Sequence, residues 1–244
     1  PIQGKLIIPA TVESIGAEAF AYCTYITELT FEDNSRLTTI GASAFDNCEN
    51  LTRVYMPANV TSIGSNAFRN CLNINSISVD SNNTSYDSRN NCNAIISTSS
   101  GVLVQGCNTT IIPNDITGIG DYAFYGCTGL TGELVIPNAA TSIGNYAFYG
   151  CAGLTGELVV PKAVTSIGNY AFNNCDKLTS ITFESDSQLT SIGDYAFSSC
   201  DKLTGDLILP DKVTSIGNYA FYNSTFRDFT MSKVNKIAKK AFYG

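Results

Sequence analysis

The chain has 244 residues, of which 44% are hydrophobic and 14% are charged, and its formal net charge is −7 at pH 7. This composition is typical of a folded chain and excludes a disordered one, while the negative charge argues against nucleic acid as a partner. The chain contains no histidine, which excludes Ser-His-Asp and Cys-His catalysis and histidine-ligated zinc.

An Ala-Phe dipeptide recurs along the whole chain and defines a repeat. Its phenylalanines are Phe20, Phe45, Phe68, Phe124, Phe148, Phe172, Phe197, Phe221 and Phe242. Neighbouring phenylalanines are 21 to 25 residues apart, except that 56 residues separate Phe68 from Phe124. A period of about 20–29 residues with leucine and isoleucine landmarks is typical of a leucine-rich-repeat solenoid. The sequence therefore predicts about ten stacked coils in a single domain over residues 1–244.

Each repeat predicts the same elements in the same order. The segment after the cysteine, for example "LVIP" at 134–137, is rich in β-branched residues and predicts a short strand closed by proline. The "VTSI" that follows predicts a second short strand. Glycines such as Gly64 and Gly144 are expected to permit a tight turn or a positive φ. Asp121, Asn145 and their equivalents are expected to cap short helical turns through Tyr-Ala-Phe, with the phenylalanine in the core.

The one long interval of the repeat, at residues of about 80–112, predicts a β-hairpin inserted into the solenoid. Its segment "NNCNAIISTSSGVLVQGC" turns near Ser99 and Ser100, so that paired residue numbers sum to 199. Cys92 and Cys107 satisfy this sum and would face each other across the ladder. The sequence predicts either a disulfide or a tightly packed pair of thiols at these two positions.

Seven further cysteines lie three residues after the repeat phenylalanine: Cys23, Cys48, Cys71, Cys127, Cys151, Cys175 and Cys200. Ser224 takes this place in the eighth repeat. Adjacent coils would bring these residues within disulfide range, but stacked parallel side chains rarely offer the required dihedral angle, which favours buried free thiols. No base and no second type of ligand lies nearby, so the sequence predicts no catalytic residue, no metal site and no cofactor.

Charge is distributed unevenly along the chain. From Arg227 onward, Asp228 is the one acidic residue beside five basic ones, Arg227, Lys233, Lys236, Lys239 and Lys240. This segment predicts either a small docking patch or a solvated last coil. The acidic corners at Glu32–Asp33 and at Glu184 with Asp186 are expected to be solvated turns, since they lack the alternating oxygens of a calcium loop.

Tyrosines beside the Ala-Phe dipeptide are the best local candidates for ligand contact. They are Tyr122, Tyr125, Tyr146, Tyr149, Tyr170, Tyr195, Tyr219 and Tyr222. A ladder of surface rings, one in each coil, could hold a sugar or a peptide side chain, because each ring has a flat face and a polar tip. The alternative is ring stacking between coils that only extends the core.

The pattern "IPxxVTSIGxxAFxxCxxLTSI" resembles the BspA-like leucine-rich-repeat family (LRR_5), and its repeats cover essentially the whole chain. The insertion at residues 86–120 resembles a segment common in such proteins from Bacteroides. The resemblance implies an extracytoplasmic protein, either secreted or anchored at the cell surface as an outer-membrane lipoprotein, and several family members are implicated in adhesion. The motif residues belong to the scaffold, so the resemblance transfers no binding site to numbered positions.

These observations favour a non-enzymatic binding or adhesion module that contacts protein or glycan on a host or bacterial surface. The alternatives are a structural spacer that displays another domain and a carbohydrate-active enzyme. No apolar run approaches the roughly 18 residues of a membrane helix. Membrane attachment would therefore depend on an anchor outside this sequence, which we expect to be part of a longer protein.

Overall fold

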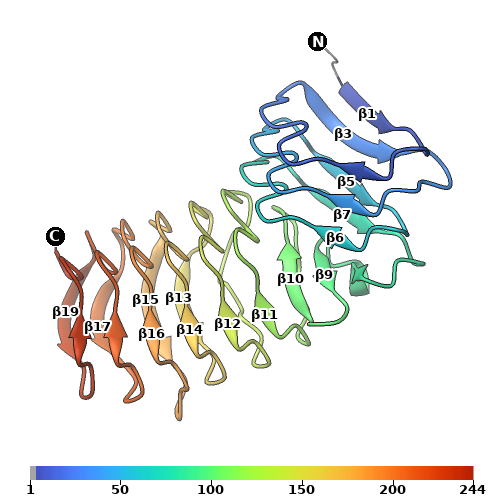
Figure 1. Cartoon of the computed structure of the whole chain (residues 1–244). Coiled ribbons are helices and arrows are strands. Elements are labelled where there is room, and N and C mark those ends of the chain that lie inside the picture. Colours follow the sequence, from blue (N-terminus) through green and yellow to red (C-terminus); the bar gives the residue numbers. More distant parts are fainter. Residues whose placement is uncertain (1–3, 244) are drawn as a thin grey trace. The chain divides into compact units, whose positions relative to one another are not determined.

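The computed structural model describes residues 4–243, which form a β-solenoid of about ten coils (Figure 1). The chain is divided into two compact units, residues 1–113 and 114–244, and the division follows directly after the predicted insertion. The one helical element among residues 4–243 is the 3-10 turn η1 (Arg89–Asn91). In this part of the chain no helix has the length and apolar character needed to cross a membrane.

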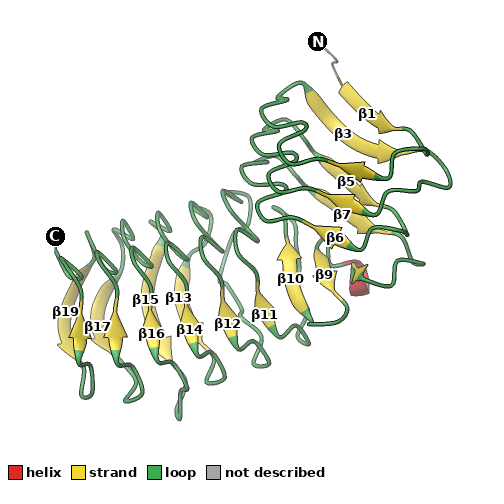
Figure 2. Cartoon of the chain, viewed as in Figure 1, coloured by secondary structure: helices red, strands yellow, loops and turns green. Residues whose placement is uncertain are grey.

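In the first unit, the coils build two parallel sheets (Figure 2). The longer strands pair in the order β1 (Gly4–Ile8), β3 (Ile26–Phe31), β5 (Arg53–Met56) and β7 (Ser76–Val79). The two-residue strands pair in the order β2 (Ser14–Ile15), β4 (Thr39–Ile40) and β6 (Ser62–Ile63). Ile15, Ile40 and Ile63 are in register, so each "SI" pair places its isoleucine on the same side in every coil.

The second unit repeats this arrangement. Its two-residue strands are β11 (Gly118–Ile119), β12 (Ser142–Ile143), β14 (Ser166–Ile167), β16 (Ser191–Ile192), β18 (Ser215–Ile216) and β20 (Lys236–Ile237), which pair in that order. The longer strands form two pairs, β13 (Gly156–Val160) with β15 (Leu178–Phe183) and β17 (Thr204–Ile208) with β19 (Thr225–Thr230). The strand predicted at 134–137 is absent. A single bridge between Gly132 and Leu154 takes its place, so this coil contributes one backbone pairing to that side.

Stacked phenylalanine rings form the centre of each unit. In the first unit Phe20, Phe45 and Phe68 stack with centroids 5.2 and 5.4 Å apart. In the second unit six rings, from Phe124 to Phe242, stack at 5.0 to 5.4 Å with interplanar angles of 3 to 11°. The predicted core spine is thus confirmed as one column of three rings and one column of six.

The Ala-Phe segment consists of turns and does not form the predicted helical turn. An α-helix bonds each N–H to the carbonyl four residues earlier, whereas here alternate N–H groups donate to the next coil. The Tyr170 N–H donates to the Asp194 carbonyl at 2.8 Å. The Phe172 N–H donates to the Ala196 carbonyl, also at 2.8 Å. Tyr170 and Asn174, on either side of the phenylalanine, have φ values of 56 and 59°, and this left-handed backbone ends any helix.

The residues predicted as helix N-caps connect neighbouring coils instead. The Asp121 Oδ1 accepts a hydrogen bond from the Asn145 N–H in the next coil at 2.6 Å. The same bond recurs at 2.6 to 3.1 Å through the rest of the unit. We call this series the Asx ladder, and its members are Asp121, Asn145, Asn169, Asp194 and Asn218. Because the carbonyl and amide groups point to a neighbouring coil, the ladder stabilises stacking between coils and not a helix start.

The glycine after each short strand is explained by the close approach of the preceding coil. A β-carbon on Gly64 would lie 2.3 Å from the Ala42 nitrogen, and one on Gly144 would lie 2.6 Å from the Asp121 nitrogen. Neither glycine has a positive φ, so the expectation of a left-handed conformation is wrong at these two positions. Ala238 takes the same position in the coil of β20, where the structure accommodates its methyl group.

We expect Gly168→Ala to lower the free energy of unfolding by about 3 kcal/mol. The new β-carbon would lie 2.6 Å from the Asn145 nitrogen and 2.6 Å from the Gly144 carbonyl carbon, and backbone atoms cannot move aside without separating the coils. Gly16→Ala is the matched control, because a β-carbon on Gly16 meets nothing within 4 Å, and it should change stability by less than about 0.5 kcal/mol. Urea denaturation measures both, and equal costs would disprove the close-approach explanation.

The insertion contains the predicted β-hairpin. Strand β9 (Ile95–Ser97) pairs antiparallel with β10 (Val102–Gln105), and β8 (Tyr86–Asp87) pairs with the other side of β9. Leu103 pairs with Ile96, in agreement with the predicted sum of 199. The register then shifts by one residue, because Gln105 pairs with Ile95. A bulge of this kind ends regular pairing on that side of the hairpin.

Cys92 and Cys107 are therefore not joined across the ladder, and both are free thiols in this structure. The Cys107 thiol donates to the Asn93 carbonyl at 3.4 Å, whereas the Cys92 sulfur lies 3.8 Å from the Ser88 hydroxyl. The register shift explains the difference from the predicted disulfide, since the pairing sum of 199 no longer holds beyond Leu103. Each sulfur packs against its own polar neighbour.

Candidate binding surfaces

The remaining cysteines belong to the scaffold. Five of their thiols donate to a phenylalanine carbonyl of the preceding coil at 3.0 to 3.1 Å: Cys48, Cys71, Cys151, Cys175 and Cys200. The Ser224 hydroxyl makes the same bond to the Phe197 carbonyl at 3.3 Å. Burial raises the pKa of Cys151 and Cys200 to about 12, so both thiols stay protonated and unreactive at neutral pH. The prediction of free thiols is confirmed.

The candidate tyrosines gather on one part of the second unit. We call them the tyrosine surface, which consists of Tyr122, Tyr125, Tyr146, Tyr149, Tyr170, Tyr195, Tyr219 and Tyr222, all of them half-buried. Its main ladder runs from Tyr122 through Tyr146, Tyr170 and Tyr195 to Tyr219, with centroids 4.6 to 4.8 Å apart. Beside it Tyr125 stacks on Tyr149 at 4.7 Å. Tilted pairs such as Tyr146 with Tyr149, at 5.7 Å, join the two rows into one aromatic surface.

The backbone of the main ladder does not require aromatic residues. Its five tyrosines have φ values of 54 to 58°, a left-handed conformation that is costly for bulky side chains. In the first unit the same position, two residues before the phenylalanine, holds Glu18, Ser43 and Asn66 at φ values of 58, 54 and 60°. The solenoid therefore forms with small polar or acidic residues at this position, and the rings of the second unit are not needed to build a coil.

The rings of the tyrosine surface are neutral hydrogen-bonding phenols. Partial burial, and secondarily the neighbouring tyrosines, raise the pKa of Tyr146. Partial burial, followed by Tyr195 and Asp194, raises the pKa of Tyr170. Each ring thus presents an uncharged polar tip beside an apolar face, which suits contact with sugars and with amphipathic side chains.

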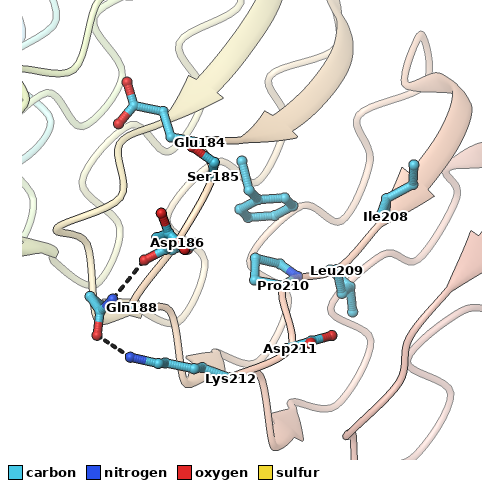
Figure 3. Close-up of a pocket in the computed structure, with 11 residues that line it drawn as sticks. Glu184, Ser185, Asp186, Gln188, Ile208, Leu209, Pro210, Asp211 and Lys212 are labelled. Atoms are coloured by element: carbon cyan, nitrogen blue, oxygen red, sulfur yellow. Dashed lines mark hydrogen bonds between the residues drawn. The ribbon is translucent and has the colours of Figure 1, made fainter.

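A pocket of about 450 Å³ lies where the acidic corner after β15 meets the proline corner after β17 (Figure 3). Phe183, Ile208 and Pro210 line its apolar side, while Glu184 and Asp186 belong to the polar rim. The Lys212 ammonium donates to the Gln188 side chain, whose amide in turn donates to the Asp186 carbonyl at 2.6 Å, as the dashed lines in Figure 3 show. No tyrosine of the tyrosine surface lines this pocket.

The first unit has a counterpart at the same place in its repeat. This pocket of about 310 Å³ combines the acidic corner at Glu32–Asp33 with Tyr55 and Asp80. The Tyr55 hydroxyl donates to the Asp80 carboxylate at 2.5 Å. Burial, together with this bond, raises the pKa of Tyr55 to about 12, and the bond lowers the pKa of Asp80.

The acidic corners are anchored turns and not only solvated ones. Glu32 accepts the Ala10 N–H at 2.9 Å, and Glu184 accepts the Lys162 N–H at 2.9 Å, in each case from the preceding coil. Sequence reasoning missed these bonds and both pockets. The signal that could have revealed them is the shared spacing of "FEDNSRL" and "FESDSQL", each followed one coil later by a proline corner.

Comparison with known proteins agrees with this architecture. The model of the BspA type leucine rich repeat region matches six copies over residues 3–100, 104–156 and 117–244. No curated protein matches the sequence significantly.

Among solved structures, the pneumococcal vaccine antigen PcpA has a TM-score of 0.59 at 21% identity, with coverage of 94% of this chain and 68% of that chain. A leucine-rich repeat protein from Eubacterium ventriosum has a TM-score of 0.53 at 21% identity, with coverage of 90% and 82%. A leucine rich cell surface protein from Faecalibacterium prausnitzii has a TM-score of 0.50 at 22% identity, with coverage of 95% and 79%. These likenesses show a shared fold, and the family match over nearly the whole sequence shows that the chain belongs to the BspA-type leucine-rich repeat family.

Proposed function

We propose that the chain is a non-enzymatic binding module that works outside the cytoplasm, either secreted or held at the cell surface through a lipoprotein anchor. Its partner would be a protein or glycan on a host or bacterial surface. The family supports this location, as do the similar structures described as a cell surface protein and as a vaccine antigen. A repeat scaffold suits the role because it presents many weak contacts in register.

The observation that carries the proposal is the tyrosine surface. Five coils in succession place a tyrosine in a left-handed conformation that other coils fill with glutamate, serine or asparagine. The scaffold alone does not account for this choice. Half-exposed stacked rings offer an extended flat surface with hydroxyl groups at its edge, and tyrosine is among the residues that contribute most to binding energy at interfaces.

The proposal is tested by binding to a glycan array and to a panel of matrix proteins. The double variant Tyr146→Asn/Tyr170→Asn removes two rings from the middle of the ladder, and asparagine suits the backbone because Asn66 holds the equivalent position at φ 60°. We expect affinity for the ligand to fall about 30-fold, which corresponds to about 2 kcal/mol.

Tyr22→Asn is the matched control for this experiment. Tyr22 also has a left-handed backbone, with φ of 61°, and its side chain is 70% exposed, but it lies in the first unit outside the tyrosine surface. This variant should bind as the native chain does. Silence of the native chain on both panels, or unchanged binding by the double variant, would refute the proposal.

A further inference from the structure

Three polar surface ladders of the second unit each end in a lysine in the coil of β20. Ser142, Ser166, Ser191 and Ser215 are in register along the short strands, and Lys236 is the next member of that series. The Lys239 N–H receives the last bond of the Asx ladder, from Asn218 Oδ1 at 3.1 Å. Lys240 takes the position of the ladder tyrosines, with φ of 53°. "SIGNY" is thus replaced by "KIAKK", which changes a neutral face into a basic edge.

Two of these lysines border a groove of about 540 Å³, which we call the lysine groove. It is lined by Asn169, residues 191–194, residues 215–218, Lys236, Ala238 and Lys239. The lining supplies serine hydroxyls, asparagine amides and two ammonium groups from neighbouring coils. Lys240 is directed elsewhere, since its ammonium group lies 4.4 Å from the centroid of the Tyr243 ring.

The charge of the groove is positive. Its one carboxylate, Asp194, already accepts hydrogen bonds from the Asn218 N–H at 2.6 Å and from the Asn218 side-chain amide at 3.1 Å. Neither Lys236 nor Lys239 forms an ion pair with any carboxylate among residues 4–243. Both ammonium groups are exposed and free to pair with an anion.

We propose that the lysine groove binds an anionic glycan. Sulfate or carboxylate groups of the glycan pair with Lys236 and Lys239, while its hydroxyl groups bond to the serines and asparagines of the adjoining coils. The regular series of neutral donors and acceptors suits a sugar chain, and the net charge of −7 disfavours a long phosphate backbone. The inference rests on the proposed binding function and names its ligand class.

The competing explanation is that the lysines protect an exposed strand. Charged residues on an edge strand prevent pairing with another chain, and Lys236 lies in β20. In that case their removal would cause self-association and leave glycan binding unchanged. The two explanations therefore predict different results for the same variant.

The test uses heparin as a sulfated probe, hyaluronan as a probe whose only anionic groups are carboxylates, and dextran as a neutral reference. Titration calorimetry at several salt concentrations compares the native chain with Lys236→Gln/Lys239→Gln. We expect the native chain to bind heparin in a salt-dependent manner, and the double variant to bind it at least about 10-fold more weakly. Binding to hyaluronan as well would show that carboxylates suffice, and binding to heparin alone would show that sulfate is required.

Lys177→Gln/Lys202→Gln is the matched control, because it removes the same charge from two exposed lysines outside the groove. It should bind heparin as tightly as the native chain does. The inference is overturned if the native chain binds neither anionic probe, if the control pair loses as much affinity as the groove pair, or if the groove variant self-associates with unchanged affinity. Tyrosine-dependent binding to another ligand in the first of these cases would leave the proposed function standing.

Discussion

Phe172→Ala is expected to lower the free energy of unfolding by about 4 kcal/mol. The Phe172 ring is fully buried and stacks on Phe148 at 5.1 Å and on Phe197 at 5.2 Å. Inter-coil hydrogen bonds hold the backbone on both sides, so neighbouring coils cannot close the space that the ring leaves. The variant therefore loses the transfer free energy of the ring and retains a cavity in the middle of the column.

Phe242→Ala supplies the control for that prediction. The Phe242 ring is half-buried and stacks on one ring of the column, Phe221, at 5.2 Å. Its removal should cost about 2 kcal/mol, since less apolar surface is exposed to water. Urea denaturation followed by circular dichroism measures both variants. Equal costs for Phe172 and Phe242 would contradict a column whose interior members carry more stability than its last one.

The repeat itself could be predicted because its landmarks act through spacing alone. A phenylalanine that returns every two dozen residues can only be buried by others like it if the coils stack in phase. The cysteine position was predictable for the same reason, and Ser224 confirms that a small donor is what this position requires. The short "SI" strands also follow directly from the sequence.

The turns around the phenylalanine could not be predicted from local preferences. Asp or Asn before Tyr-Ala-Phe is typical of a helix start, but the hydrogen bonds of these residues go to another coil, 24 or 25 residues away. Tyrosine rarely adopts a left-handed conformation, and only the bonds between coils require it of Tyr170. Local sequence contains neither fact, so the helical prediction was wrong there.

The candidate sites were predictable to different degrees. The tyrosine ladder follows from spacing, because rings at the same phase of a solenoid must lie above one another, and the structure stacks them at 4.6 to 4.8 Å. The acidic-corner pockets were missed because each is shared between two coils. The hairpin register was predicted up to Leu103, and a one-residue bulge then moved Cys92 and Cys107 out of alignment.

The second large effect concerns the phase of the coils. Residues 145–168 form one coil, and a second copy of them inserted after Gly168 adds 24 residues in phase. A copy of residues 145–156 at the same point adds half a coil. The insertion point leaves no room for a loop, since a β-carbon on Gly168 would meet the Gly144 backbone at 2.6 Å and the Asn169 N–H bonds to Asn145 Oδ1 at 2.8 Å.

Denaturation of these two insertion variants is the most direct measurement of whether coils must stack in phase. The whole-coil variant is predicted to unfold cooperatively at a urea concentration no lower than that of the native chain, because each new coil adds an interface of the same kind. The half-coil variant should lose more than about 4 kcal/mol, the expected cost of one interior ring. If the whole-coil insertion destabilises the chain as much as the half-coil insertion, the solenoid is not held together by copies in register, and the account is wrong.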